Sequence, residues 1–328
     1  MTTIKTTLAR RSLRALVAGT MFSLAAIATA AAAEQPAAAE KPAAAPAEQP
    51  AAVEKPAHAP AGEPVAASAP AEHYQIPRQN WTFGGLFGYF DEQQLRRGYK
   101  IYKNVCANCH NMRFLAYRNL GEPGGPNFSK EEVAALAAEI QVQDGYNDQG
   151  EPIMRPGKPS DYFQWHFKNE KEAGAAFNGA APPDLSVMAK ARTVERDIAW
   201  YTFPFLMLKD LFTQYQEQGP DYLYALLTGY VDPPAGFKLN AGSNYNRAFP
   251  GHQIAMPQPL TDGAVDYEDG TPNTLDQESK DVVSFLAWAA EPHLVERKKL
   301  GILVLAYLAA LAGLLFVAKK TLWRNVEH

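Results

Sequence analysis

The two cysteines of the 328-residue chain lie three positions apart, at Cys106 and Cys109, and His110 follows them directly. This Cys-x-x-Cys-His pattern is the attachment motif of a c-type haem. Each thiol adds to one vinyl group of the porphyrin. The two cysteines must therefore lie about one helical turn apart and on the same face. The adjacent histidine is directed at the iron as an axial ligand. The pattern therefore predicts one covalently bound haem c.

Two other chemistries use closely spaced cysteines. A structural zinc site needs four ligands, and the sequence has no second pair at matching spacing. A thioredoxin-like redox pair follows a strand in a βαβ unit, whereas the segment before Cys106 has a helical pattern. Haem attachment is the favoured interpretation of the motif.

The second axial ligand must come from another part of the chain. The methionines that follow the motif are Met112, Met154, Met188, Met207 and Met256. Met112 is too close to the motif to reach the opposite haem face, and Met188 and Met207 lie in apolar, helix-like stretches where a core role is expected. Met256 lies in a proline-bracketed loop, residues 249–260, that can hold a thioether in place. We call this segment the Met256 loop. His252 in the same loop is the alternative, and Met256 is favoured because His/Met ligation suits electron transfer.

Helical patterns flank the haem motif in the sequence and position it. Asp91 can cap a helix whose apolar residues recur at helical spacing up to the motif. Gly98 within this helix costs about 1 kcal/mol relative to alanine, so we expect a close contact there. Thr274 and Gln277 have the spacing of a capping box before a second helix with one apolar face. Two helices that cross at a glycine form the scaffold expected of a small c-type cytochrome, and two unrelated amphipathic helices are the alternative. The expected fold is mainly α, a class I c-type cytochrome fold with long loop insertions.

Both ends of the chain carry segments outside this domain. Residues 1–33 have a basic head, an apolar alanine-rich stretch and an Ala-x-Ala site, which favour a secretory signal peptide over an uncleaved anchor. Residues 34–72 are nearly all Ala, Pro, Glu and Lys, a composition expected to form a disordered spacer. Residues 300–318 carry no charge and are long enough to cross a bilayer. The remaining predicted parts are a haem domain over 73–298, a transmembrane helix over 299–318 and a short tail over 319–328.

The signal peptide orients the chain, because basic residues flank the apolar segment on both sides. An exported haem domain leaves the C-terminal tail in the cytoplasm. The whole chain has a net charge of −4, and the signal holds four basic residues and no acidic one, so the exported chain carries −8. An acidic surface suggests a basic partner, and solubility alone is the alternative explanation.

Further phrases, in a fixed order from about residue 73 to the end, resemble the cytochrome c1 family, the haem subunits of ubiquinol–cytochrome c reductase (bc1) complexes. Besides the Met256 loop, the phrases are Arg96-Arg97-Gly98-Tyr99, Ala116-Tyr117-Arg118, Gln143-Asp144-Gly145, Arg155-Pro156-Gly157-Lys158, Ser160-Asp161-Tyr162-Phe163, Asn178-Gly179-Ala180, Pro182-Pro183-Asp184-Leu185-Ser186, Leu226-Leu227-Thr228-Gly229-Tyr230 and Trp288-Ala289-Ala290-Glu291-Pro292.

The resemblance implies a single-pass protein of a bacterial inner membrane, with its haem domain in the periplasm. It implies that the haem accepts an electron from the Rieske iron–sulfur protein and passes it to a soluble cytochrome c, beside cytochrome b in a dimeric complex. Membrane lipid is a further expected partner and nucleic acid is not. The family's axial methionine lies in such a Phe-Pro-Gly loop, which supports Met256. The resemblance also suggests Arg192 and Tyr222 as partners of the haem propionates, and Asp184 as a cap for the following helix.

Some features of the chain leave open questions. Residues 193–219 look like an aromatic-rich insertion relative to mitochondrial members, with no predicted role. A free-standing membrane-tethered electron shuttle and a haem-based gas sensor are the alternative functions. Acidic side chains near the haem edge are candidates for steering a basic cytochrome c, and a solvated surface is the other explanation. The candidates are Glu131, Glu132, Asp266, Glu268 and Asp269.

Overall fold

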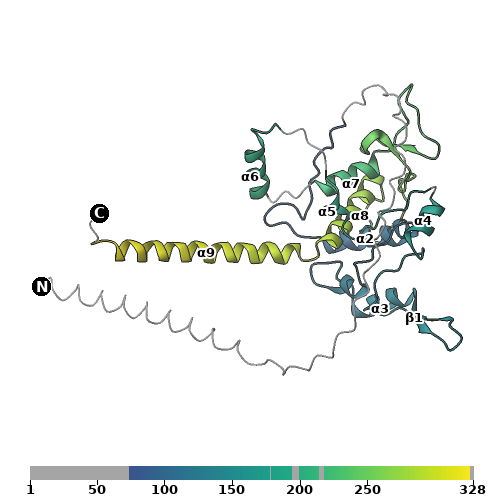
Figure 1. Cartoon of the computed structure of the whole chain (residues 1–328), viewed down its shortest axis with the longest axis horizontal. Coiled ribbons are helices and arrows are strands. Elements are labelled where there is room, and N and C mark those ends of the chain that lie inside the picture. Colours follow the sequence, from purple (N-terminus) through teal and green to yellow (C-terminus); the bar gives the residue numbers. More distant parts are fainter. Residues whose placement is uncertain (1–73, 178, 194–198, 214–217, 326–328) are drawn as a thin grey trace, which may run out of the picture. The chain divides into compact units, whose positions relative to one another are not determined.

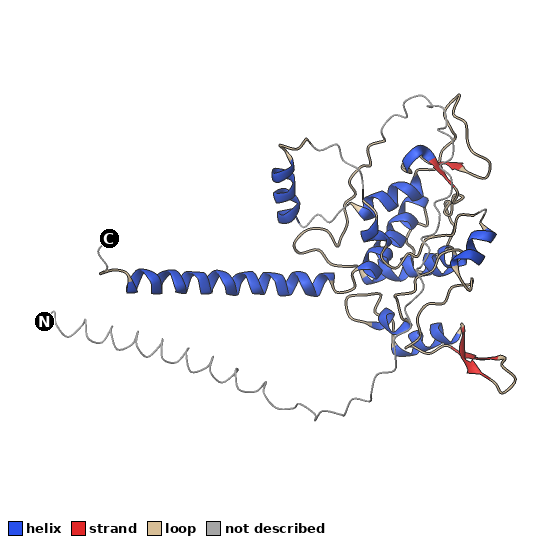
Figure 2. Cartoon of the chain, in the orientation of Figure 1, coloured by secondary structure: helices blue, strands red, loops and turns tan. Residues whose placement is uncertain are grey.

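The computed structural model describes residues 74–325, apart from 178, 194–198 and 214–217. The predicted signal peptide (1–33) and spacer (34–72) lie outside the described residues. The described part is mainly α, as predicted, with short antiparallel strand pairs (Figure 2). Its elements are α2 (Glu92–Asn104), η1 (Cys106–Asn108), η2 (Tyr117–Gly121), α3 (Lys130–Ala138), β1 (Gln141–Tyr146), β2 (Pro152–Pro156), α4 (Glu170–Ala176), α5 (Met188–Ala191), α6 (Phe203–Thr213), α7 (Gly219–Thr228), β3 (Asn244–Tyr245), η3 (Pro250–His252), β4 (Gln253–Ile254), α8 (Leu275–Ala290) and α9 (Leu294–Leu322).

Helices α2 and α8 pack against each other at Gly98 (Figure 1). Asp91 caps α2 as predicted, since its Oδ1 accepts a hydrogen bond of 2.7 Å from the backbone N–H of Gln94. A Cβ at Gly98 would lie 2.2 Å from the carbonyl oxygen of Asp281 and 2.7 Å from the Cβ of Phe285, both in α8. The close contact expected at Gly98 is confirmed, and it fixes the helix that leads into the haem motif.

A buried carboxylate joins the two helices beside this contact. Asp281 is fully buried and accepts hydrogen bonds from Arg97 Nε at 2.7 Å, Gln94 Nε2 at 3.1 Å and Gln277 Nε2 at 2.7 Å. The capping box predicted for α8 is only half right. Thr274 Oγ1 accepts from the backbone N–H of Gln277 at 3.3 Å. The Gln277 amide binds Asp281 rather than the backbone of Thr274, because a charged acceptor gives the stronger hydrogen bond.

Aromatic side chains fill the core around the crossing. Tyr102 stacks on Phe163 with ring centroids 5.8 Å apart, and Tyr99 meets Phe285 edge-on at 5.7 Å. Phe285 also lies 5.6 Å from Trp288, the next aromatic residue on α8. Aromatic side chains bury about 150–250 Å² each and dominate core energetics. The last turns of α2, immediately before Cys106, are therefore held by a cluster of aromatic side chains in the core.

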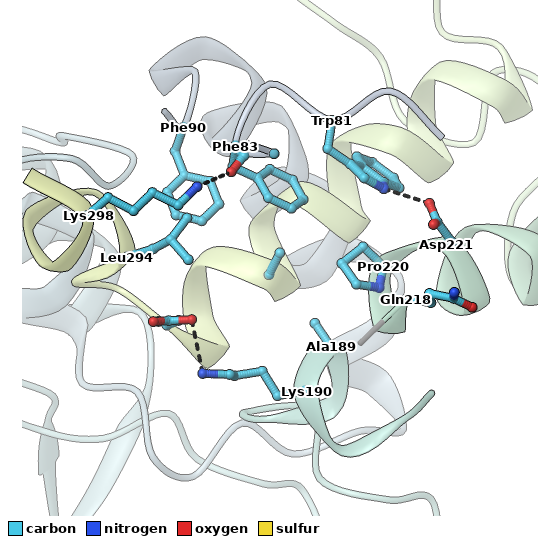
Figure 3. A pocket seen from close by; sticks show the side chains of 13 residues that line it. Trp81, Phe83, Phe90, Ala189, Lys190, Gln218, Pro220, Asp221, Leu294 and Lys298 are labelled. Atoms are coloured by element: carbon cyan, nitrogen blue, oxygen red, sulfur yellow. Dashed lines mark hydrogen bonds and ion pairs between the residues drawn. The ribbon is translucent and has the colours of Figure 1, made fainter. Parts of the chain in front are cut away.

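Helix α9 contains the predicted transmembrane segment and extends beyond it at both ends. Its most apolar 18-residue window has a mean hydropathy of 2.6, so α9 is long and apolar enough to cross a membrane. The first turn and a half of α9 belongs to the folded domain. Leu294 is buried, and Lys298 Nζ donates to the carbonyl oxygen of Phe83 at 2.8 Å (Figure 3). It also donates to the carbonyl oxygen of Gly85 at 2.6 Å.

Two of the methionines were expected in the core, and only one lies there. Met188 is buried in α5, as predicted. Met207 lies in α6, inside the predicted insertion 193–219, and is 60% exposed, so its predicted core role is wrong. Its neighbours Phe203 and Phe205 are also exposed. An apolar run is buried only where another element covers it, and periodicity cannot indicate that cover.

Candidate haem site

The cysteines of the motif lie on one tight turn at the end of α2. The backbone N–H groups of Cys109 and His110 both donate to the carbonyl oxygen of Cys106, at 3.1 and 2.8 Å. Both thiols are free, and burial raises the pKa of the Cys106 thiol to about 12. An apolar setting of this kind suits a neutral thioether sulfur. The pair therefore fits a porphyrin joined through two thioether bonds.

The orientation of His110 is set by a residue far along the chain. Its Nδ1 lies 2.8 Å from the carbonyl oxygen of Pro183. A carbonyl oxygen can only accept, so Nδ1 carries the proton and the lone pair of Nε2 is free for a metal. Burial lowers the pKa of the imidazole, which favours the neutral form that iron requires. The donor set thus fits haem iron.

The segment after Pro183 is joined to the segment after His110 by backbone hydrogen bonds. The N–H of Leu185 donates to the carbonyl oxygen of Asn111 at 2.8 Å. Asp184 accepts from the N–H groups of Arg113 at 3.0 Å and Ser186 at 2.8 Å. The predicted role of Asp184 as a helix cap is wrong, because α5 begins later, after Val187, without a side-chain cap. The carboxylate instead joins the two loops that orient the histidine.

Trp165 is a further residue at the motif, and sequence reasoning missed it. Its indole Nε1 donates to the carbonyl oxygen of Cys109 at 2.9 Å. The contact joins residues 56 positions apart, so no local pattern predicts it. Pro183 lies in the phrase Pro182-Pro183-Asp184-Leu185-Ser186, which resembles the family. That phrase is the sequence signal for the contact with His110, because proline restricts the backbone that carries the accepting carbonyl group.

The Met256 loop is fixed by more than its prolines. Strands β3 and β4 pair just before the methionine. The carbonyl oxygen of Met256 accepts hydrogen bonds from Tyr230 Oη at 3.1 Å and from Asn244 Nδ2 at 3.3 Å. Gly251 turns the chain with φ of 73°, a conformation that favours glycine. The backbone that carries the thioether is therefore held on two sides.

The competing ligand His252 is held within its own loop. Its Nδ1 lies 3.2 Å from the carbonyl oxygen of Asn246, and its ring stacks on Tyr245 with centroids 5.5 Å apart. Both contacts give the imidazole a role in the loop's own structure.

Arg192 and Tyr222 belong to neighbouring parts of the fold, since a Cβ at Gly219, at the start of α7, would lie 2.8 Å from the carbonyl oxygen of Arg192 at the end of α5. Burial raises the pKa of Tyr222, and the charge of Arg192 opposes that rise, so the guanidinium lies within electrostatic range of the phenol. Burial, with a smaller contribution from Tyr222, also raises the pKa of Tyr230. Tyr230 in turn donates to the carbonyl oxygen of Met256. The connection from Tyr222 to Met256 is thus indirect, through Tyr230, whose role sequence reasoning missed.

Three of the five acidic steering candidates form ion pairs within the chain. Glu132 pairs with Arg96 at 3.2 Å, Asp269 with Arg97 at 2.6 Å and Glu268 with Lys100 at 2.9 Å. The three cations all lie on α2, and the three carboxylates balance their positive charges. These pairs reduce the local negative field that the steering hypothesis requires.

Comparison with known proteins assigns the chain to a family. A protein named "Cytochrome b/c1" from Bradyrhizobium diazoefficiens is 51% identical over 250 residues, which are 76% of this chain and 36% of that protein. "Cytochrome c1" from Blastochloris viridis is 48% identical over 251 residues, covering 76% of this chain and 86% of its own length. "Cytochrome b-c1 complex catalytic subunit, mitochondrial" from Candida albicans is 42% identical over 260 residues, which cover 79% of this chain and 81% of that protein.

The family model named Cytochrome C1 family matches residues 81–326, a range that begins before α2 and ends beyond α9. It therefore includes the cysteine motif, the loop of Pro183, the Met256 loop and the apolar helix. Model, relatives and geometry agree, and the chain belongs to the cytochrome c1 family.

Proposed function

We propose that this chain is the haem-bearing electron-transfer subunit of a bc1 complex, a quinol–cytochrome c reductase. In this role it accepts one electron from the Rieske iron–sulfur protein and passes it to a soluble cytochrome c. The names of the relatives support membership of the complex. The observation that carries the proposal is the paired motif and histidine. Two free thiols lie on one turn, and a neutral imidazole has Nε2 available.

The residues take separate roles in the proposed site. Cys106 and Cys109 would attach the porphyrin covalently, and His110 and Met256 would ligate the iron. Bound haem supplies a one-electron redox couple. The ligand-bearing groups need only hold their positions in both redox states, since outer-sphere transfer breaks no bond. The hydrogen bonds of the His110 ring to Pro183 and of the Met256 carbonyl to its two donors serve that purpose.

Arg192 and Tyr222 are proposed to bind the haem propionates. A guanidinium pairs with a carboxylate through charge-assisted hydrogen bonds, and a phenol donates one more. The electrostatic effect of Arg192 on Tyr222, and the hydrogen bond of Tyr230 to the Met256 carbonyl, support this role. The chain itself performs no chemistry on quinol in this scheme.

The proposed location is a bacterial inner membrane. Helix α9 anchors the chain, with the haem domain (73–298) in the periplasm and the tail (319–328) in the cytoplasm. Residues 1–33 act as a cleaved signal and 34–72 as a spacer. Cytochrome b, the Rieske protein and membrane lipid are the standing partners in a dimeric complex, and the soluble cytochrome c is transient.

The first test concerns the iron. We expect Met256→Leu to abolish the iron–sulfur charge-transfer band of the oxidised haem, with His252→Gln as the matched control that retains it. A band that persists in Met256→Leu, or that is missing from the native protein, would remove Met256 from the sixth position and leave His252 as the alternative. Rapid binding of carbon monoxide to the reduced native protein at neutral pH would indicate an open site and favour the gas-sensor alternative.

The second test concerns the complex. After gentle solubilisation of the membrane, the haem protein is expected to co-purify with cytochrome b and the Rieske protein. Purification of the haem chain alone, with a normal spectrum, would favour a free-standing membrane-tethered shuttle.

A further inference from the structure

Residues 82–89 form a tight loop with two unlike faces. Phe83 in the loop and Phe90 directly after it point inward. Their side chains are 9% and 6% exposed, and their ring centroids lie 5.1 Å apart. The apolar side chains between them point outward. Exposed apolar groups that lie together mark a contact surface rather than a core. Their exposed fractions are 40% for Leu86, 82% for Phe87 and 58% for Tyr89.

The backbone of this loop is preformed. The N–H of Tyr89 donates to the carbonyl oxygen of Thr82 at 3.0 Å and closes the base of the loop. A Cβ at Gly88 would lie 2.2 Å from the carbonyl oxygen of Gly84, so the turn requires glycine. The outward direction of the apolar side chains is therefore built into the chain, and little conformational entropy is lost when they bind.

Lys298 ties the loop to the start of the apolar helix (Figure 3). The side chain is nearly buried, and its ammonium donates to the carbonyl oxygens of Phe83 at 2.8 Å and Gly85 at 2.6 Å. The charge-free stretch begins at Leu300, two residues later, which is about 3 Å along the helix axis. The loop is therefore held at the level where α9 would enter the hydrocarbon of a bilayer.

From this arrangement we infer that residues 86–89 lie in the interfacial layer of the bilayer, as a second and shallow membrane contact beside α9. The inference rests on the proposed anchoring by α9. Aromatic side chains favour the headgroup region, and tyrosine can keep its hydroxyl in water while its ring is buried. A single helix leaves the attached domain free to rotate about the helix axis. A second contact removes that freedom and fixes the face that the haem domain presents to membrane-bound partners.

The test uses the full chain with its haem, in native membranes that contain the complex. A photoreactive p-benzoylphenylalanine replaces Phe87, the membranes are irradiated, and the products are analysed by mass spectrometry. The matched control places the same group at Tyr146, an aromatic side chain that is 67% exposed in the β1–β2 hairpin. A third variant at Leu308, in the middle of α9, reports the anchor separately. The haem spectrum of each variant confirms that the domain is folded.

We expect phospholipid adducts at positions 87 and 308 and none at position 146. Adducts at 308 without any at 87 would overturn the loop contact and leave the anchor standing. A crosslink from position 87 into another polypeptide would also overturn it, because the face would then bind a protein partner. No lipid adduct at 308 would remove the anchor and the inference together. Lys298→Met, added to the variant with the photoreactive group at position 87, should abolish the lipid adduct at 87. The same substitution, added to the variant with the group at position 308, should leave the adduct yield at 308 unchanged.

Discussion

The contact at Gly98 gives a sharp prediction for a single methyl group. In Gly98→Ala the new Cβ would lie 2.2 Å from the carbonyl oxygen of Asp281 and 2.7 Å from the Cβ of Phe285. Nonpolar contacts normally settle near 3.5–4.0 Å, so α2 and α8 must separate by about 1 Å or more. Neither opposing atom is the flexible end of a side chain. The helices must therefore move as bodies, or the backbone must bend.

Two opposing effects decide the magnitude. Overpacking of a well-filled core costs about 1–3 kcal/mol, and the rigid opposing atoms favour the upper end of that range. Alanine returns about 1 kcal/mol through its higher helix propensity. The net expectation is a loss of about 2 kcal/mol in the free energy of unfolding. For a domain of this size that corresponds to a fall of about 4–8 °C in the melting temperature.

The chain contains its own control for this substitution. Gly174 also lies in a helix and is buried, but a Cβ there would meet nothing closer than 3.6 Å. Gly174→Ala should therefore be neutral or stabilising, by up to about 1 kcal/mol. Both variants are measured as full-length haem protein in detergent, by thermal unfolding followed with circular dichroism. Equal melting temperatures for the two variants would refute the argument that the helix crossing requires a glycine.

Three further variants probe the core, its titration and the Met256 loop. Asp281→Asn leaves Arg97 without its buried carboxylate and should cost about 2–3 kcal/mol in urea unfolding. That is at or below the roughly 3–5 kcal/mol of a broken buried ion pair, because other partners of Arg97 remain. A loss below about 1 kcal/mol would contradict this. Burial raises the pKa of the Glu278 carboxyl, so the folded chain keeps a proton that the unfolded chain loses. The free energy of unfolding then falls as the pH rises from the carboxyl's pKa in the unfolded chain to its pKa in the folded chain. Glu278→Gln should flatten the pH profile of the free energy of unfolding in this interval. An unchanged slope would contradict the role given to Glu278. Tyr230→Phe removes one hydrogen bond to the Met256 carbonyl, worth about 1 kcal/mol, so imidazole should displace the methionine about fivefold more readily in ferric haem titrations; unchanged affinity would mean that the bond does not hold the ligand.

The sequence was most informative where chemistry or geometry restricts the residue type. Two cysteines and a histidine in one motif predict a shared turn, and Gly98 in a helical pattern predicts a close crossing; the structure has both. The hydrogen-bond partners of the motif were not predictable locally, because Pro183 and Trp165 reach it from 73 and 56 positions away. Met207 shows a second limit. An apolar pattern gives the character of a helix and does not show whether another element covers it.

The pairing of α2 with α8 also carries a consequence for the order of events in assembly. The bond between Arg97 and Asp281 joins residues 184 positions apart. Because a chain is synthesised from its N-terminus, Cys106 is made well before α8, the helix that completes its surroundings. During that interval the thiol has an ordinary pKa of about 8.5, whereas burial in the folded domain raises the pKa to about 12. Thiolate is the reactive form, so the covalent attachment proposed at Cys106 would proceed more readily before α8 completes the fold.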